Sequence, residues 1–152
     1  MIRRDYKPDF INSVINDPSV KEGAEVKGIG DVSELIQNLN NFVLVTEFGG
    51  FVVIKKMAGV YECHTQFLPD GRGAHSYEAV KEALRYMFFQ TDCVRIVTKV
   101  NVENKAVQRF TAQFFRKRGQ QGEHFYYSLD FDDWVTTDEI CWKEGASFHS
   151  QI

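Results

Sequence analysis

Hydrophobic residues in this chain of 152 residues follow a strand period in the middle and a helical period on either side. Three runs of β-branched and aromatic residues predict three consecutive strands: Phe42 to Phe48, Phe51 to Lys56 and Val60 to Leu68. Gly49-Gly50 separates the first two runs and predicts a hairpin turn, and Ala58-Gly59 predicts the second turn. We therefore expect an antiparallel meander.

Helical spacing precedes and follows this meander. After a weak strand at Ile2 to Tyr6, the segment Asp9 to Asn16 has the apolar spacing of a short amphipathic helix. Asp31 is placed to cap a second helix ahead of the meander. Beyond a break at Pro69-Asp70-Gly71, the residues from Ser76 to Gln90 place their apolar side chains on one stripe of a longer helix.

The rest of the chain continues an α/β pattern. Cys93 to Val100 reads as a strand, Asn104 to Phe115 as a helix capped by its first residue, and Glu123 to Val135 as a strand. The third strand of the meander, the long helix and the strand from Cys93 form a β-α-β unit, which requires parallel strands and a right-handed crossover. The sequence predicts an α/β domain with a mixed, mostly antiparallel sheet, a central parallel unit and helices on both faces.

Length and composition narrow the class of protein. We expect one domain over residues 1–152, with its core in 42–135 and a C-terminal extension over 136–152. The net charge of −3 argues against a dedicated nucleic-acid-binding protein, which usually carries a basic excess. Three scattered cysteines predict neither a disulfide framework nor a metal site. No signal peptide and no membrane-spanning run is apparent, so we expect a cytoplasmic protein, or one packaged from the cytosol into a virion.

The predicted site lies where the sheet order changes, after the strand that ends at Leu68. Ligands of open α/β sheets tend to bind at such points. The loop there contains Gly71, Arg72 and Gly73 and leads into the long helix, whose first N–H groups suit a phosphate or pyrophosphate. The alternative is an ordinary turn, since Glu78 in the first helical turn would repel an anion.

This segment resembles the GNAT-type N-acyltransferases over roughly residues 42–119. The resemblance rests on the loop Leu68-Pro69-Asp70-Gly71-Arg72-Gly73 between a strand and an amphipathic helix, and on Asn104 opening the next helix. It implies a GNAT-like fold, in which the strand before the loop is splayed from its parallel neighbour and the pantetheine of acetyl-CoA pairs with its edge. The residues then expected to contact acetyl-CoA are Phe67, Leu68, Arg72, Gly73, Ala74, His75, Ser76 and Asn104.

Three positions depart from the family pattern. His75 and Tyr77 stand where the family loop has small residues, and we expect their side chains to crowd a pyrophosphate. Thr111 stands where the family often has a tyrosine that protonates the leaving thiolate. These departures favour a protein that keeps the fold and has lost the reaction.

Acetyl transfer to an amine needs a base, and either Glu62 or His64 is a candidate because both lie on one face of the same strand. A buried structural histidine and a surface carboxylate are the plain alternatives. Tyr126 is a candidate acid for the thiolate, with aromatic packing as its alternative. The cluster Arg116-Lys117-Arg118 is expected to end the helix of Asn104, where it complements the helix dipole or binds the adenosine 3′-phosphate.

Two functions remain open from the sequence. The first is an N-acetyltransferase that uses acyl-CoA and an amine. The second is a head-assembly or internal virion protein of a phage, with phage structural proteins as partners, because Tyr61 to Phe89 most resembles small phage-encoded GNAT-like proteins. The acceptor amine and the oligomeric state, with a homodimer among the alternatives, are also open.

Overall fold

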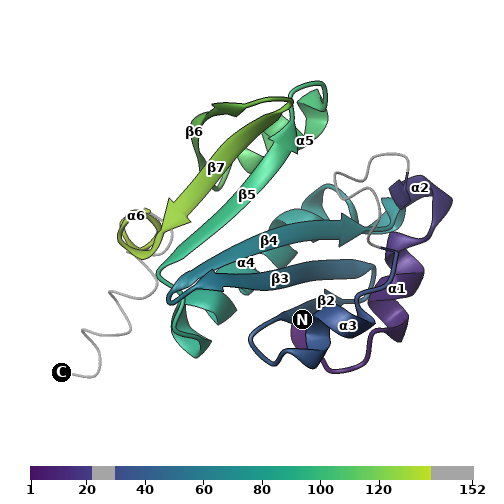
Figure 1. Ribbon diagram of the computed structural model, residues 1–152. Helices are drawn as coiled ribbons and strands as arrows, with labels where there is room; N and C mark the ends of the chain where they lie inside the picture. Colours follow the sequence, from purple (N-terminus) through teal and green to yellow (C-terminus); the bar gives the residue numbers. More distant parts are fainter. Residues whose placement is uncertain (22–29, 138–152) are drawn as a thin grey trace.

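A computed structural model describes residues 1–21 and 30–137 of the chain (Figure 1). Its centre is a seven-stranded sheet in the order β1-β2-β3-β4-β5-β7-β6. The strands are β1 (Arg3–Asp5), β2 (Phe42–Thr46), β3 (Gly49–Met57), β4 (Val60–Phe67), β5 (Arg95–Asn101), β6 (Arg116–Gln121) and β7 (His124–Asp130). The helices are α1 (Asp9–Ile15), α2 (Pro18–Lys21), α3 (Ser33–Gln37), α4 (Ala74–Gln90), α5 (Lys105–Thr111) and α6 (Phe131–Val135), with a 3₁₀ turn η1 (Pro69–Gly71). The predicted mixed sheet is confirmed.

Only β4 and β5 run parallel, and they pair over a short distance. Their register comprises Val60↔Arg95, Tyr61↔Ile96 and Glu62↔Val97, and it stops there. On its other side β4 pairs with β3 along its whole length, up to Gly49↔Phe67. Since β4 stays with the meander, β5 diverges from it, and Figure 1 shows the two strands opening into a V.

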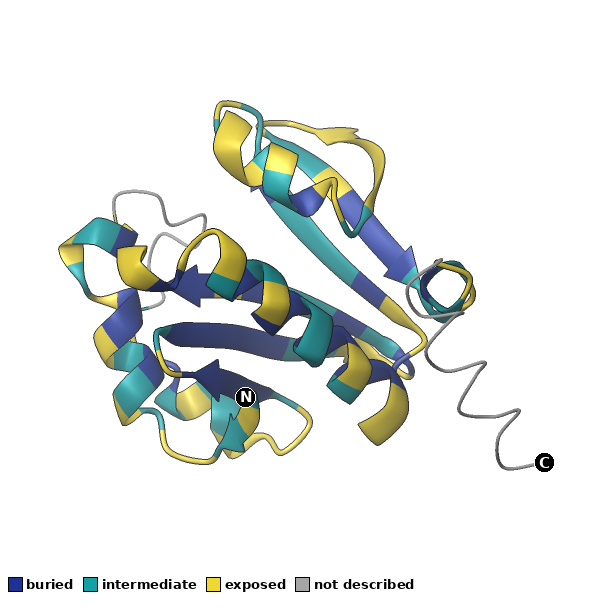
Figure 2. Ribbon diagram, turned by 180° about the vertical axis from the view of Figure 1, so that it is seen from behind, coloured by how far each residue is buried: buried dark blue, intermediate teal, exposed yellow. Residues whose placement is uncertain are grey.

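Each sheet face has its own hydrophobic core. On one face, α4 packs its buried stripe, including Val80, Leu84 and Met87, against β2 to β5. On the other face, α1 packs Ile11 and Val14 against the opposite side chains of β2 and β3. Figure 2 shows the first face, where α4 crosses the sheet and turns its exposed residues outwards.

The β2–β3 hairpin is confirmed, but its turn is not at Gly49-Gly50. The turn residues are Glu47 and Phe48, and both glycines belong to β3. A Cβ on Gly49 would lie 2.1 Å from the carbonyl oxygen of Gln66, and one on Gly50 would lie 2.0 Å from that of Leu44. The glycines are therefore required by close approach of the flanking strands rather than by the turn.

The C-terminal third differs from the prediction in three elements. The helix after Asn104 ends at Thr111, and Arg116–Gln121 is an exposed edge strand, β6, so the basic cluster does not end a helix. The strand predicted to reach Val135 ends at Asp130, and α6 follows it. An all-polar edge strand lacks the apolar alternation by which strands are recognised in a sequence. Most of the expected extension over 136–152, together with Cys141, lies outside the described residues.

Candidate functional site

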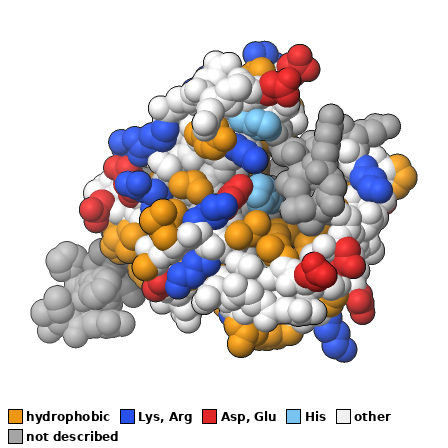
Figure 3. Space-filling model, in the orientation of Figure 1, with side chains coloured by type: hydrophobic (Ala, Val, Ile, Leu, Met, Phe, Trp, Pro, Cys, Tyr) orange, Lys and Arg blue, Asp and Glu red, His pale blue; other side chains and the backbone are white. Residues whose placement is uncertain are grey.

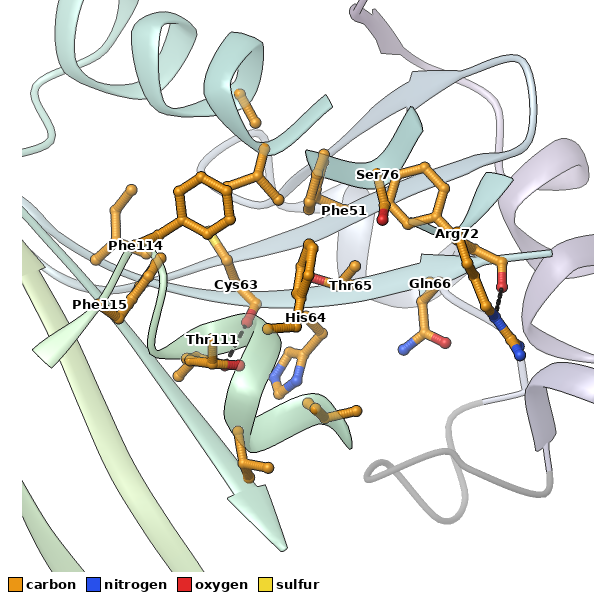
Figure 4. A pocket seen from close by; sticks show the side chains of 18 of the residues that line it. Phe51, Cys63, His64, Thr65, Gln66, Arg72, Ser76, Thr111, Phe114 and Phe115 are labelled. Atoms are coloured by element: carbon orange, nitrogen blue, oxygen red, sulfur yellow. Dashed lines mark hydrogen bonds between the residues drawn. The ribbon is translucent and has the colours of Figure 1, made fainter. Parts of the chain in front are cut away.

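The divergence of β4 and β5 opens a cavity of about 730 Å³. Its walls come from the two strands, α4, α5 and α2, and Figure 4 shows β4 crossing it. Phe51, Val80 and Met87 contribute to an apolar floor, and Phe110 and Phe114 close the side formed by α5. The volume falls within the range of about 300–1,000 Å³ typical of small-molecule sites.

A single side chain bridges the point where the two strands part. The hydroxyl of Thr98 on β5 donates a hydrogen bond of 3.0 Å to the carbonyl oxygen of Cys63 on β4. Beyond this bridge, no residue in the described part of β5 pairs with Thr65, Gln66 or Phe67 of β4. The backbone of β4 therefore presents an open edge to the cavity, where an extended ligand can form strand-like hydrogen bonds.

The loop after β4 is built by close packing at Gly71 and by a left-handed residue at Gly73. Gly71 is buried beneath Phe48, where a Cβ would lie 2.3 Å from the Phe48 Cβ. Gly73 has φ of 74° and its Cα faces open space, because a Cβ would meet nothing within 4 Å. Its carbonyl accepts the first α4 hydrogen bond, from Tyr77 N–H at 3.0 Å.

The start of α4 is suited to an anion. No described side chain caps the helix, so the N–H groups of its first turn have no side-chain acceptor. Arg72 lies beside them and is held in place by two backbone carbonyls: its Nε donates to Phe67 O at 3.2 Å and its guanidinium donates to Ser19 O at 3.0 Å. Figure 4 shows Arg72 at the end of the cavity opposite Phe114 and Phe115. This end of the cavity therefore combines a fixed positive charge with a helix N-terminus.

His75 and Tyr77 do not crowd this loop as the sequence suggested. The His75 ring packs edge-on against Phe48 and Phe67, with centroid distances of 5.1 and 5.9 Å, and its Nε2 lies 3.0 Å from Thr46 Oγ1. The Tyr77 ring packs 5.0 Å from that of Phe114. Neither side chain lines the cavity. Both are occupied by packing within the protein, which leaves the loop accessible.

Glu62 and His64 form a hydrogen-bonded pair on the face of β4 opposite α4. His64 Nε2 lies 3.0 Å from Glu62 Oε1, and Lys56 Nζ lies 3.2 Å from the second carboxylate oxygen. The His64 hydrogen bond, assisted by Lys56, lowers the pKa of Glu62 to about 2. An ionised carboxylate only accepts hydrogen bonds, so the proton of neutral His64 lies on Nε2 and the lone pair lies on Nδ1. His64 is buried and lines the cavity, whereas Glu62 is not among the residues that line it.

The other predicted site residues are distributed as follows. Phe67, Ser76 and Asn104 line the cavity with Arg72 and Gly73, and Asn104 also caps α5 through Val107 N–H at 3.2 Å. Leu68, Ala74 and His75 adjoin the cavity without lining it. Tyr126 is 37% exposed, on the face of β7 opposite the buried Tyr127, and does not line the cavity.

Sequence reasoning missed the residues contributed by β5 and α2. Thr98, Lys99 and Ser19 line the cavity, but nothing in the sequence distinguished them from ordinary strand and helix positions. Their position depends on the register at which β5 leaves β4. Strand β5 also contains the polar residues Arg95 and Asn101, so the polarity of Thr98 and Lys99 gave no indication of the site.

The two described thiols are those of Cys63, which is partly buried, and Cys93, which is buried. Burial raises the pKa of the Cys63 thiol, and burial likewise raises that of Cys93 to about 12. Within residues 1–21 and 30–137, no three His, Cys, Asp or Glu side chains gather in the geometry of a metal site. In the same part of the chain, no helix has the length and apolar character needed to cross a membrane.

Solved structures share this arrangement over nearly the whole chain. A spermidine N-acetyltransferase mutant from Vibrio cholerae superposes with a TM-score of 0.68 at 15% identity, covering 90% of this chain and 98% of that one. FdhC, a nucleotide-linked sugar GNAT, superposes with a TM-score of 0.66 at 16% identity, covering 95% of this chain and 92% of that one.

No protein-family model and no curated protein sequence matches the chain. Neither superposed structure is described as a phage protein, so the closer likeness to phage head-assembly proteins stays a prediction. With its mostly antiparallel sheet, its one splayed parallel pair and its helices on both faces, the chain has the GNAT fold.

Proposed function

We propose that this chain binds acetyl-CoA between β4 and β5 and transfers the acetyl group to an amine. The observation that carries the proposal is the open edge of β4, which begins at the Thr98–Cys63 bridge and leads to the start of α4. The pantetheine arm is an extended amide chain, which can pair with such an edge as a strand does. Of the superposed proteins, one is a spermidine N-acetyltransferase and the other a nucleotide-linked sugar GNAT, which supports the same class of reaction.

The residues at the far end of this edge fit a pyrophosphate. Gly73 leaves the approach to the helix open, since nothing lies within 4 Å of where its Cβ would be. The first turn of α4 offers N–H groups, and Arg72 adds a positive charge that its two carbonyl partners fix in place. In this proposal, Arg72, Gly73 and the start of α4 hold the pyrophosphate.

Acetyl-CoA supplies an activated thioester, and the chain supplies the proton acceptor. His64 takes the proton of the acceptor ammonium, directly or through water, because the lone pair of neutral His64 lies on Nδ1. Glu62 orients the imidazole and stabilises the imidazolium that forms. Glu62 is itself a poor base, because its pKa lies at about 2. In this proposal His64 is the base and Glu62 its partner, whereas the sequence left the base open between them.

Among the described residues that line the cavity, no side chain is suited to protonate the leaving thiolate. Thr111 is buried and lines the cavity, but its hydroxyl is far less acidic than a phenol near pKa 10. Tyr126 lies outside the lining, and no tyrosine lies among the described residues that line the cavity. We therefore assign protonation of the thiolate to solvent.

Thr111 also favours one alternative, in which the fold binds the acyl donor without using it. The sequence predicts this alternative as a phage head-assembly or internal virion protein. His75 and Tyr77 no longer support it, because their rings pack within the protein.

Calorimetric titration with acetyl-CoA tests the proposal. We expect a Kd in the micromolar range, about −8 kcal/mol, for the wild-type chain. Arg72→Glu should weaken binding about 100-fold or more, since it replaces an attraction with a repulsion. Arg3→Glu on β1 makes the same change at an exposed position outside the cavity and should leave the Kd unchanged.

The absence of detectable heat at millimolar acetyl-CoA would overturn the proposal. Thiol release in the presence of amines separates it from the alternative, which predicts binding without turnover. Thermal unfolding of each variant confirms that a lost signal is not lost folding.

A further inference from the structure

The described residues that line the cavity carry a net positive charge. Among the described residues that line it there is no aspartate or glutamate. Its cations are Arg72 and Lys99, with His64 a third when protonated. Arg72 lies at the proposed pyrophosphate site, which leaves Lys99 without an assigned ligand.

Lys99 lies across the opening from His64. Glu62 pairs with Val97, and the Thr98–Cys63 hydrogen bond shows that the strands remain level one residue further on. The next step of the same register brings Lys99 level with His64, on the same sheet face, since side chains alternate along both strands. Both residues line the cavity, His64 from β4 and Lys99 from β5.

Lys99 differs from its basic neighbours in having no counter-charge within the described part of the chain. On this face Lys56 pairs with Glu62 at 3.2 Å, Arg95 with Asp130 at 2.7 Å and Arg118 with Asp133 at 3.7 Å. No ion pair or hydrogen bond to the Lys99 side chain occurs within residues 1–21 and 30–137, although the side chain is partly buried. A partly buried cation without a partner is unfavourable, and an anionic ligand relieves that cost. Figure 3 shows this face, with basic, acidic and histidine side chains close together around hydrophobic ones.

We infer that the acceptor is a small amine that also carries an anionic group, a carboxylate or a phosphate, which binds Lys99 while the amine lies at His64. The inference rests on the proposed function and specifies its substrate class. A polyamine fits poorly, because no described lining residue is acidic and the carboxylate beside His64, Glu62, is already shared by His64 and Lys56.

Calorimetry on the protein saturated with coenzyme A tests the inference with matched probes. Alanine is compared with alaninamide, and glucosamine 6-phosphate with glucosamine, so that each pair differs in one anionic group. Spermidine is the polycationic comparison. We expect at least one anionic member to bind about tenfold more tightly than its uncharged counterpart, and the pair that shows it identifies carboxylate or phosphate as the group. Spermidine should bind more weakly than that probe.

Lys99→Gln should remove this preference and leave the Kd of acetyl-CoA unchanged. Lys7→Gln makes the same substitution at an exposed position outside the cavity and should change neither. Equal binding within both pairs, tighter binding of spermidine, or no binding of any probe would overturn the inference. A loss of acetyl-CoA affinity in Lys99→Gln would also overturn the inference, because it would show that Lys99 binds the acyl donor. Failure of wild-type protein to bind acetyl-CoA is a different result, which overturns the proposed function itself.

Discussion

Thr98 Oγ1 donates a 3.0 Å hydrogen bond to the carbonyl oxygen of Cys63 at the point where β4 leaves β5. The last backbone register pair of the two strands is Glu62↔Val97, one residue earlier on each strand. The Thr98 side chain thus joins β4 and β5 just beyond the last backbone pair of the two strands. It satisfies one carbonyl that would otherwise face the cavity, and it marks the inner end of the open β4 edge.

Thr98→Val removes this bridge with little change of shape. We expect a loss of about 1 kcal/mol in the free energy of unfolding, the usual contribution of such a hydrogen bond. Urea denaturation measures it. Thr65→Val is the matched control, because Thr65 is an exposed residue of β4 whose hydroxyl has no partner among the described residues. Equal stability of the two variants would show that the bridge contributes nothing.

Glu62 should make stability depend on acid pH. Its pKa is about 2 in the folded chain and 4.5 in an unfolded one, so the unfolded state binds the proton first as pH falls. The stabilisation is therefore complete above about pH 5 and is lost as the pH falls towards 2, with an upper bound of about 3 kcal/mol. Glu62→Gln should be less stable than wild type at pH 7, and the difference should shrink at pH 3.

Urea denaturation of both proteins at the two pH values measures this effect. Glu47→Gln is the control, since Glu47 is exposed in the β2–β3 turn and has no ion pair within the described residues. A stability difference between wild type and Glu62→Gln that is the same at pH 3 and pH 7 would contradict the assigned pairing.

Gly50 should tolerate no side chain. A Cβ there would lie 2.0 Å from the carbonyl oxygen of Leu44 on β2, so Gly50→Ala must push β2 and β3 apart. We expect a loss of about 3 kcal/mol or more, in the range of severe core overpacking. Gly119→Ala on β6 should change stability by less than about 0.5 kcal/mol, because a Cβ there meets nothing within 4 Å. Comparable stability losses in the two variants would refute the close approach.

His64→Gln tests the assignment of the base. The variant should lower kcat by about 100-fold or more, the usual contribution of general base catalysis, while the Kd of acetyl-CoA stays within about threefold. Glu62→Gln should cause a smaller fall in kcat, because Glu62 acts through His64. Steady-state thiol release and calorimetry on the same samples provide both quantities. A wild-type kcat in His64→Gln would show that another group acts as the base.

The sequence predicted the elements with strong apolar periodicity and missed those without it. The stripe of Val80, Leu84 and Met87 identified α4, and β-branched runs identified the meander. Strand β6 consists of exposed polar residues at the sheet edge, so its pairing with β7 and not its pattern makes it a strand. Gly49-Gly50 has the sequence of a turn dipeptide, yet both glycines lie in β3. They are required there because β2 and β4 approach the β3 backbone closely.

The residues of the candidate site were likewise only partly predictable from the sequence. Arg72, Gly73 and the start of α4 follow one another in sequence, so a local motif was sufficient to find them. The role of His75 depends on Thr46 and Phe48, which lie almost thirty residues away in sequence. Thr98 and Lys99 belong to the site only because β5 separates from β4 at one particular register pair, which no local pattern encodes.

Amide chemical-shift mapping with acetyl-CoA tests the central claim most directly. If the donor lies along the open edge of β4, the largest shifts should fall on the amides of Thr65 to Phe67 and of Gly73 to Ser76, with the remote strand β1 unaffected. Saturable binding that leaves those amides unchanged and shifts others instead would contradict a donor site between β4 and β5.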